Sequence, residues 1–391
     1  MMKNKKVLLG ITGGIAAYKA VDLASRLTKL GTVVKTIMTK SACEFVSPLT
    51  FKSITHQSVT TKMFDANTDI EHISLADWAD IVVIAPATAN IIGKVASGIA
   101  DDVLSTTIMA TTAPVLFVPA MNVHMFENPI VQENISKLQK HGYSFIQPEF
   151  GKLACGYTGK GRYPKNEEIV FHLETYLNRK KDLAGKTVLI TSGATQEKID
   201  PMRFITNYSS GKTGLALARA AAIRGAEVKL ITANTNESLP EYFDVIKVTT
   251  AEEMYKETMK AFPENDIIIM AAAVSDYTPA QPSNHKIKKG DNLQLELART
   301  KDILAELGQK KQDSQILIGF AAETQHLRDN ALGKMKRKNL DMIVANDLKV
   351  AGKGDTEVLL LTSKTEKSCS GSKFEVAHQI LDSILSIEKI R

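Results

Sequence analysis

The sequence predicts an α/β protein with two doubly wound domains, each a parallel sheet covered by helices on both faces. Two stretches open in the same way, with an apolar strand, a polar loop that contains glycine, and an amphipathic helix. The first spans residues 6–31 and the second residues 186–225. Anions bind at the strand-to-helix turn of such units. Two turns of this kind therefore predict two Rossmann-like domains, each with an anion-binding site.

Length and composition favour a globular enzyme that binds small anions. A chain of 391 residues can form two domains, and 44% hydrophobic residues suffice for two cores. The net charge of +6 is too small and too scattered to predict a nucleic-acid partner. Three cysteines without paired spacing, no signal-peptide core and no apolar run of membrane length predict a cytoplasmic protein without a membrane partner.

The first half alternates apolar strands with amphipathic helices, which predicts a parallel sheet. The expected strands are 7–11, 33–38, 81–85, 115–118 and 143–146, and the expected helices include 15–30, 91–100 and 131–140. A charged stretch then runs from Asn178 to Asp182. We expect it to join two domains, residues 1–180 and 181–391.

The alternating pattern starts again in the second half. The expected strands are 188–191, 227–231, 245–248, 267–271, 316–320, 342–345 and 358–361. Between two of them lies the irregular segment 278–298, in which Leu293, Leu295 and Leu297 alternate with other residues. This alternation predicts a β-arm inserted into the second domain.

The glycine spacing argues against a nicotinamide dinucleotide. The fingerprint for such a cofactor reads Gly-x-Gly-x-x-Gly, whereas residues 10–14 read Gly-Ile-Thr-Gly-Gly. The second strand of each domain is also expected to end in an acid, but these strands end at Thr39 and Thr232. A dehydrogenase is therefore not the expected function.

A P-loop is also not predicted, although Gly211-Lys212-Thr213 resembles its end. Thr206 stands where the first glycine of that motif belongs. We instead expect residues 209–211 to offer hydroxyl and backbone donors to an anion at a helix N-terminus. An ordinary N-cap is the simpler alternative.

Three polar segments in the first half could carry chemistry. His72 precedes an expected helix at 75–79, and Asn122 follows an expected strand. Cys155 lies in a glycine-rich and basic segment, 154–162, for which we expect no regular element but a flexible flap that closes a thiol over a substrate. Each residue also has a simpler reading: a capping or core histidine, a turn asparagine and a small buried cysteine.

Sequence motifs in both halves resemble known enzyme families. In the first half, GGIAAYK at 13–19, APATAN at 85–90, PAMN at 119–122 and the segment ACGYTGKGR at 154–162 resemble flavin-dependent cysteine decarboxylases. In the second half, DPMRFITNYSSGK at 200–212, AAAVSDY at 271–277 and KIKK at 286–289 resemble phosphopantothenate–cysteine ligases. Over nearly its full length the chain is similar to bifunctional coenzyme A biosynthesis proteins.

The first resemblance implies a flavodoxin-like flavoprotein domain that decarboxylates 4′-phosphopantothenoylcysteine to 4′-phosphopantetheine. It implies that His72 orients the substrate or accepts a proton, that Asn122 holds the carboxylate and that Cys155 returns a proton. The implied FMN-binding residues are Gly13, Gly14, Ile15, Thr39, Ser41, Pro86, Ala87, Asn90 and Ser105.

The second resemblance implies a ligase domain that couples 4′-phosphopantothenate to cysteine through an acyl-cytidylate made from CTP. Asn207 is expected to stabilise this intermediate, with Arg203 one helical turn before it, and Lys286 is expected to act at the nucleotide. The implied CTP-binding residues are Ala273, Asp276, Lys286, Lys301, Asp302, Ile303, Phe320, Lys334 and Lys338. Mg²⁺ is expected on the phosphates, since the sequence shows no metal-ligand spacing of its own.

Lys334 and Lys338 are four residues apart, which places them on one helix face and favours a triphosphate. A solvated basic face is the alternative. The second half also departs from the ligase pattern at Ala194, Gln196 and Thr213.

The resemblance further implies a homo-oligomer, a dodecamer formed by trimers of the flavin domain and dimers of the ligase domain. Two other functions are weighed against the bifunctional enzyme. One is a chain with a single active domain, and the other is a flavin-binding regulatory or assembly subunit with an inert flap.

Overall fold

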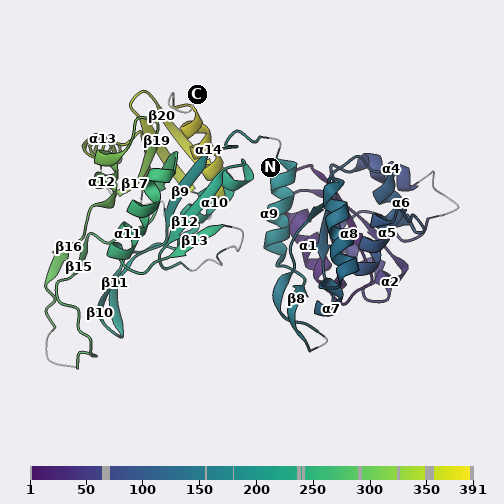
Figure 1. Cartoon of the computed structure of the whole chain (residues 1–391). Helices are drawn as coiled ribbons and strands as arrows, with labels where there is room; N and C mark the ends of the chain where they lie inside the picture. Colours follow the sequence, from purple (N-terminus) through teal and green to yellow (C-terminus); the bar gives the residue numbers. More distant parts are fainter. Residues whose placement is uncertain are drawn as a thin grey trace. The chain divides into compact units, whose positions relative to one another are not determined.

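The structure is a computed structural model that describes residues 2–63, 71–154, 156–178, 180–235, 239, 243–288, 293–323, 326–347 and 356–387. The chain forms two compact units, residues 1–179 and 180–391 (Figure 1). Each unit contains a central sheet with helices on both faces, so the predicted α/β class is confirmed. Within the described ranges, every helix is too short or too polar to cross a membrane.

The first unit contains a six-stranded parallel sheet of order β3-β2-β1-β4-β5-β6. Without the two-residue β3, this order is that of flavodoxin-like sheets. The strands are β1 (Lys6–Ile11), β2 (Val33–Met38), β3 (Val59–Thr60), β4 (Ile81–Ala87), β5 (Val115–Pro119) and β6 (Ser144–Phe145).

Helices cover both faces of this sheet because its strands are apolar on both sides. Leu9 of β1 packs with Leu23 in one cluster, and its neighbour Leu8 packs with Leu104 in the other. The helices are α1 (Ala17–Lys29), α2 (Lys40–Cys43), α3 (Pro48–Thr55), α4 (Glu71–Trp78), α5 (Ala89–Ala96), α6 (Val103–Ala110), α7 (Val123–Phe126), α8 (Pro129–Lys140) and α9 (Asn166–Leu177).

The glycine-rich segment of the first unit is partly regular, which corrects the sequence prediction. Strand β8 (Thr158–Arg162) pairs antiparallel with β7 (Glu149–Lys152). Its glycines permit a close approach that a side chain would block, since a Cβ at Gly161 would lie 2.4 Å from the carbonyl oxygen of Met121. The segment therefore forms one strand of a hairpin, and this strand lies against Met121. Cys155 lies outside the described residues.

The second unit contains an eight-stranded sheet of order β13-β12-β9-β14-β17-β18-β19-β20. The first six strands are parallel in the Rossmann order, and β19 and β20 are antiparallel. The sequence did not predict β20. The strands are β9 (Thr187–Ser192), β12 (Glu227–Thr232), β13 (Asp244–Lys247), β14 (Ile267–Met270), β17 (Ile316–Glu323), β18 (Met342–Asp347), β19 (Thr356–Thr362) and β20 (Glu366–Gly371).

Two apolar clusters, one on each face of this sheet, form the core of the second unit. The helices are α10 (Lys212–Ile223), α11 (Ala251–Ala261), α12 (Ile303–Lys310), α13 (Leu327–Arg337) and α14 (Lys373–Leu385), with a 3-10 turn at Phe262–Glu264. Arg224, directly after α10, is only 1% exposed. Its guanidinium binds Asp182 at 2.7 Å and Asp382 of α14 at 2.9 Å. Asp182, predicted to lie in the joint, is thus held by the second unit.

Two antiparallel hairpins extend from the second unit and lie next to each other (Figure 1). The first consists of β10 (Gln196–Asp200) and β11 (Arg203–Thr206), and the second of β15 (Tyr277–Pro279) and β16 (Leu297–Arg299). The second hairpin agrees with the predicted β-arm at its base, where Leu297 lies in β16, whereas Leu293 and Leu295 lie outside a strand. The first was not predicted, and it places Arg203 in a strand, so the expected helical turn between Arg203 and Asn207 is wrong.

Candidate active sites

The turn after β1 is fixed to the end of β4 by the hydroxyl of Thr12. This buried hydroxyl donates to the Pro86 carbonyl oxygen at 2.7 Å and accepts from the backbone N–H of Thr88 at 3.2 Å. The predicted residues Gly13 and Gly14 therefore lie beside Pro86 and Ala87, at the carboxyl edge of adjacent strands. This edge is where doubly wound sheets bind their ligands.

The same turn has the features of an anion cradle. A Cβ at Gly13 would lie 2.3 Å from the Cβ of Ser41, so only glycine lets the turn approach α2 this closely. Within the part of the chain that the structure describes, the backbone N–H groups of Gly13 and Ile15 find no acceptor. These N–H groups precede α1 and fit a phosphate.

The other predicted flavin contacts lie at the same edge but differ in what their side chains do. Thr39 is the N-cap of α2, where its hydroxyl accepts from the Ala42 N–H. Asn90 is exposed in the first turn of α5. Ser105 is fully buried, and its hydroxyl bonds with the carboxylate and backbone of Asp102 in a capping box. Ser105 thus has a structural role of its own.

Asn122 lies where the β7–β8 hairpin meets the end of β5. Its side-chain oxygen caps α7 by accepting from the His124 N–H at 2.8 Å. The Met121 N–H donates to the Gly161 carbonyl oxygen at 3.0 Å, and Tyr157 stacks edge-on against His124 with ring centroids 5.1 Å apart. The structure therefore brings the hairpin that leads to Cys155 against the Asn122 loop.

His72 lies in the first turn of α4, which begins earlier than the sequence predicted, and its side chain is half-buried. The neighbouring Glu71 accepts a hydrogen bond from Thr60 at 2.6 Å, which ties the start of α4 to β3. The described residues do not show His72 in contact with Asn122.

The second unit contains a cavity of about 390 Å³ at the carboxyl ends of β14 and β17. Its wall combines side chains from the end of β17, the base of the β-arm, the start of α12 and the end of α13. The predicted nucleotide-binding residues that line it are Asp276, Lys301, Asp302, Ile303, Phe320, Lys334 and Lys338. The structure thus gathers in one cavity predicted residues as far apart in the sequence as Asp276 and Lys338.

Two cations of this cavity, Lys334 and Lys338, are held in place by neighbouring groups. Lys338 binds the carboxylate of Asp302 at 2.8 Å, and Lys334 donates to the Phe320 carbonyl oxygen at 2.8 Å. Burial alone would raise the pKa of Asp302, but the hydrogen bond from Lys338 lowers it below its usual value. An ionised Asp302 also caps α12 by accepting from the Ala305 N–H. Lys334 and Lys338 therefore face the same cavity from one side of α13, as predicted.

Several cavity-lining residues were missed by the sequence analysis. Tyr277, Arg299 and Thr300 line the wall from the base of the β-arm. Thr300 fixes this base, because its N–H donates to the Asp276 carbonyl oxygen and its hydroxyl to that of Ser275. The alternation of Leu293, Leu295 and Leu297 predicted the arm but gave no sign that its base forms a wall.

Ala273, Asn207, Arg203 and Lys286 are not among the residues that line the cavity. The Asn207 amide donates to the Val274 carbonyl oxygen at 3.2 Å, and Val274 itself lines the cavity. Ala273 bridges to Ala194 in the turn after β9. Arg203 binds the carboxylate of Asp200, and Lys286 is exposed.

Residues 209–211 lead directly into α10. Gly211 is the N-cap residue, with φ of 76° and no side-chain cap. Ser192 donates to the Gly211 carbonyl oxygen at 2.9 Å and fixes this turn against the end of β9.

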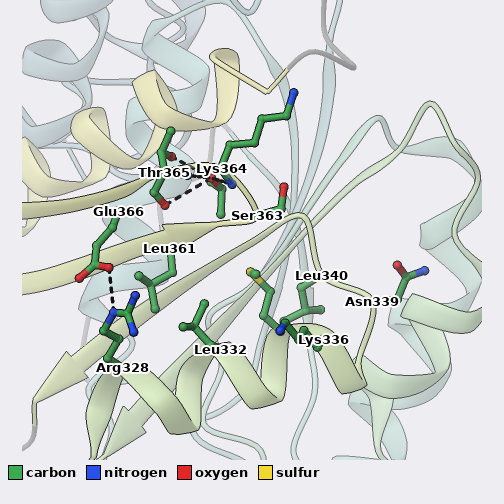
Figure 2. Close-up of a pocket in the computed structure, with 12 residues that line it drawn as sticks. Arg328, Leu332, Lys336, Asn339, Leu340, Leu361, Ser363, Lys364, Thr365 and Glu366 are labelled. Atoms are coloured by element: carbon green, nitrogen blue, oxygen red, sulfur yellow. Dashed lines mark hydrogen bonds and ion pairs between the residues drawn. The ribbon is translucent and has the colours of Figure 1, made fainter.

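A second hollow, of about 520 Å³, lies between α13 and the β19–β20 turn (Figure 2). Its rim holds an ion pair between Arg328 and Glu366 at 2.9 Å, and Leu332 and Leu361 line its floor. It contains none of the predicted site residues, although it is the larger of the two. Size alone therefore does not identify the site.

Comparisons with known proteins divide the chain at nearly the same place. Residues 1–177 match the family model described as "Flavoprotein", and residues 183–387 match the "DNA/pantothenate metabolism flavoprotein C-terminal domain". The chain is 48% identical to the "Coenzyme A biosynthesis bifunctional protein CoaBC" of Bacillus subtilis (strain 168), covering 100% of this chain and 98% of that protein. It is 45% identical to the protein of the same name from Borreliella burgdorferi, covering 97% of this chain and 99% of the relative.

A solved structure of the C-terminal domain of a protein with this name is 39% identical. The match covers 52% of this chain and 96% of the chain in that structure, with a TM-score of 0.45.

Proposed function

Because this chain belongs to the family of bifunctional coenzyme A biosynthesis proteins, we propose that its two units catalyse consecutive reactions on one intermediate. The first unit is an FMN-dependent phosphopantothenoylcysteine decarboxylase and the second is a phosphopantothenate–cysteine ligase. The alternative of a regulatory or assembly subunit is not favoured. The ligase product, 4′-phosphopantothenoylcysteine, is the substrate of the decarboxylase.

The cavity of the second unit is the observation that best supports a nucleotide site for the ligase. It has lysines on one side, a hydrogen-bonded carboxylate and an aromatic residue, which suit a triphosphate joined to a base. We propose that Lys334 and Lys338 bind the CTP phosphates, and that Asp276 and Phe320 bind the nucleoside. Mg²⁺ is proposed on the phosphates, held by them rather than by a protein site.

The ligase must activate a carboxylate, because an amine cannot displace an oxide-like leaving group at neutral pH. Attack of the carboxylate oxygen of 4′-phosphopantothenate on the α-phosphate of CTP forms an acyl-cytidylate and releases pyrophosphate. The cysteine amine then displaces CMP from the acyl carbon. Asn207, whose amide reaches the Val274 carbonyl at the cavity wall, is proposed to stabilise the acyl-cytidylate.

The decarboxylase site is proposed at the carboxyl edge of the first sheet. When bound, FMN supplies an electron acceptor and donor, which decarboxylation of an ordinary cysteine carboxylate requires. The Gly13 and Ile15 N–H groups, for which the described residues offer no acceptor, are proposed to hold its phosphate. Asn122 is proposed to orient the carboxylate with a neutral donor, which avoids the extra ground-state stabilisation of a cation. His72 is proposed to orient the substrate or accept a proton, and Cys155 to return one.

We also infer a homo-oligomer, a dodecamer with the flavin units as trimers and the ligase units as dimers. Large exposed apolar side chains occur on both units, among them Ile15, Ile130, Met202 and Leu293. A mass near twelve chains in native mass spectrometry supports this arrangement, and a stable monomer contradicts it. The cytoplasmic location stays a prediction.

One assay tests both reactions. Purified protein is given 4′-phosphopantothenate, cysteine and Mg²⁺, with and without CTP, and the products are identified by mass spectrometry. CTP-dependent 4′-phosphopantetheine, with CMP and pyrophosphate, supports both proposals and their order. If phosphopantothenoylcysteine accumulates, the decarboxylase assignment is contradicted, and if no CMP forms, the ligase assignment is contradicted.

A further inference from the structure

The segment that carries Lys286 is tied to the β10–β11 hairpin at two places. The Ser283 N–H donates to the Ile199 carbonyl oxygen at 2.9 Å. Four residues later, the Ile287 N–H donates to a carboxylate oxygen of Asp200 at 3.1 Å, and the Ile287 carbonyl oxygen accepts from the Arg203 guanidinium at 2.9 Å. Both backbone polar groups of the residue after Lys286 are thus fixed by the Asp200–Arg203 pair.

Asp200 is the centre of this arrangement. Its side chain is fully buried, and both carboxylate oxygens accept hydrogen bonds. One accepts the N–H groups of Met202 and Arg203, at 2.8 and 2.9 Å, and the other accepts from Arg203 and Ile287. Donors thus surround a buried anion, which keeps it ionised and rigid.

The Arg203 guanidinium remains partly exposed although it binds Asp200. It gives Nε and Nη2 to Asp200, and Nη2 also reaches Ile287, while its side chain remains 42% exposed. Arg203 and Lys286 are thus two exposed cations on backbone segments that the same carboxylate fixes. Cations whose backbone is held in place meet an anionic ligand at a smaller entropy cost than cations on a mobile backbone.

We propose that Asp200 is a positioning residue of the ligase, which holds Lys286 and Arg203 in the geometry that an anionic substrate group requires. Asp200 does not contact the substrate and acts through the two cations. This inference rests on the proposed ligase role of Lys286. It extends that proposal, since nothing in the sequence motif distinguishes Asp200 from an ordinary turn aspartate.

A double-mutant cycle in the full chain tests the inference. Asp200→Asn keeps the shape of the side chain but turns an amide N–H toward the Ile287 N–H or the guanidinium, so we expect ligase kcat/KM to fall about 10- to 100-fold. Because Asp200 acts through Lys286 and Arg203, we expect Asp200→Asn to cost less in a Lys286→Met background, where only Arg203 remains to be positioned. Asp200→Glu, which keeps the charge, is expected to recover part of the rate.

The decarboxylase activity of the same protein, assayed with supplied phosphopantothenoylcysteine, monitors folding of the first unit, and circular dichroism monitors the second. Glu366→Gln is the matched control, because it removes a carboxylate from an exposed ion pair of the same unit. Full ligase activity in Asp200→Asn, or fully additive losses in the cycle, overturns the inference. If the unmodified protein releases no CMP, the proposed ligase function fails instead.

Discussion

The two units use the same kind of sheet edge but build their candidate sites from different groups. In the first unit, the turn after β1 is held by a threonine hydroxyl and by close glycine packing, and every predicted flavin contact is an uncharged residue. In the second unit, the cavity and the neighbouring hairpin are held by ion pairs, Lys338 with Asp302 and Arg203 with Asp200.

This difference matches the charges that each reaction handles. A ligase that brings together a triphosphate and a carboxylate must offset several negative charges before two anionic groups can meet. A decarboxylase must instead avoid stabilising its starting carboxylate more than the transition state. Charged pairs at one site and neutral donors at the other are what these requirements predict.

The largest expected effect concerns Arg224. Its substitution tests whether the second unit can be destabilised while the stability of the first unit stays the same. Arg224→Met removes charge-assisted hydrogen bonds to two partly exposed carboxylates, so we expect the free energy of unfolding of the second unit to fall by about 3 kcal/mol. Urea unfolding is followed by circular dichroism and by fluorescence of Trp78, the one tryptophan of the sequence, which reports the first unit. An equal shift of the Trp78 transition would contradict independent units.

Lys338 tests the charged cavity directly. Lys338→Met removes the ammonium that binds Asp302, and we expect ligase kcat/KM for CTP to fall about 10- to 100-fold, the loss of a charge-assisted hydrogen bond. Lys310→Met, which breaks the exposed pair with Glu306 at 2.7 Å, is the control. Unchanged CTP kinetics in Lys338→Met would remove the cavity from the proposed site.

A substitution of Thr12 tests the proposed flavin site of the first unit, whose predicted contacts are uncharged. Thr12→Val keeps the shape but leaves the buried Pro86 carbonyl oxygen without its donor, which costs about 1 to 3 kcal/mol in the first unit. We expect a lower flavin content, measured by absorbance, and unchanged ligase activity. Thr28→Val, which removes a hydroxyl bond to Ala24 within α1, should keep the flavin. Loss of flavin in the control would show that the effect is not specific to the turn.

The smallest expected effect is a pH dependence of the second unit that comes from His378. Burial, and then the nearby Arg224 charge, lower the pKa of His378 to about 4 from an ordinary value of 6.5. The folded state therefore favours neutral His378, so its contribution is complete above pH 6.5 and is lost as the pH falls toward 4. We expect a loss of about 1 kcal/mol over this range, reduced by partial exposure.

His378→Leu should flatten this part of the curve for the second unit, measured by urea unfolding at several pH values. The Trp78 transition reports the first unit, where burial also lowers the pKa of His172, so its own pH dependence should be the same with and without the substitution. If the free energy of unfolding of the second unit still falls equally with pH after the substitution, groups other than His378 cause the dependence.

The sequence predicted the parallel strands well because buried strands such as 81–85 and 267–271 are continuous apolar runs. It missed the β10–β11 hairpin, since Gln196, Lys198 and Arg203 are polar and their strands project from the sheet. The β8 strand was missed because glycines normally weaken strands, whereas here Gly159 and Gly161 allow it to lie against Val123 and Met121.

For the candidate sites, the motifs located the nucleotide-binding residues that meet in one cavity, but they did not reveal how those residues are supported. The role of Asp302 in binding Lys338 depends on the approach of the start of α12 to the end of α13, which no local pattern encodes. Likewise, the capping box of Ser105 and the clamp of Asp200 on Ile287 depend on which backbone groups face each carboxylate.

The arrangement around Arg224 has a practical consequence for dissecting the chain. A single guanidinium joins Asp182, near the start of the second unit, to Asp382, near its end. A fragment designed to contain the second unit must therefore include both carboxylates, so a cut placed after Asp182 or before Asp382 removes one side of the same anchor. Cut positions around residue 180 preserve this anchor, and they leave the sheet of the first unit intact.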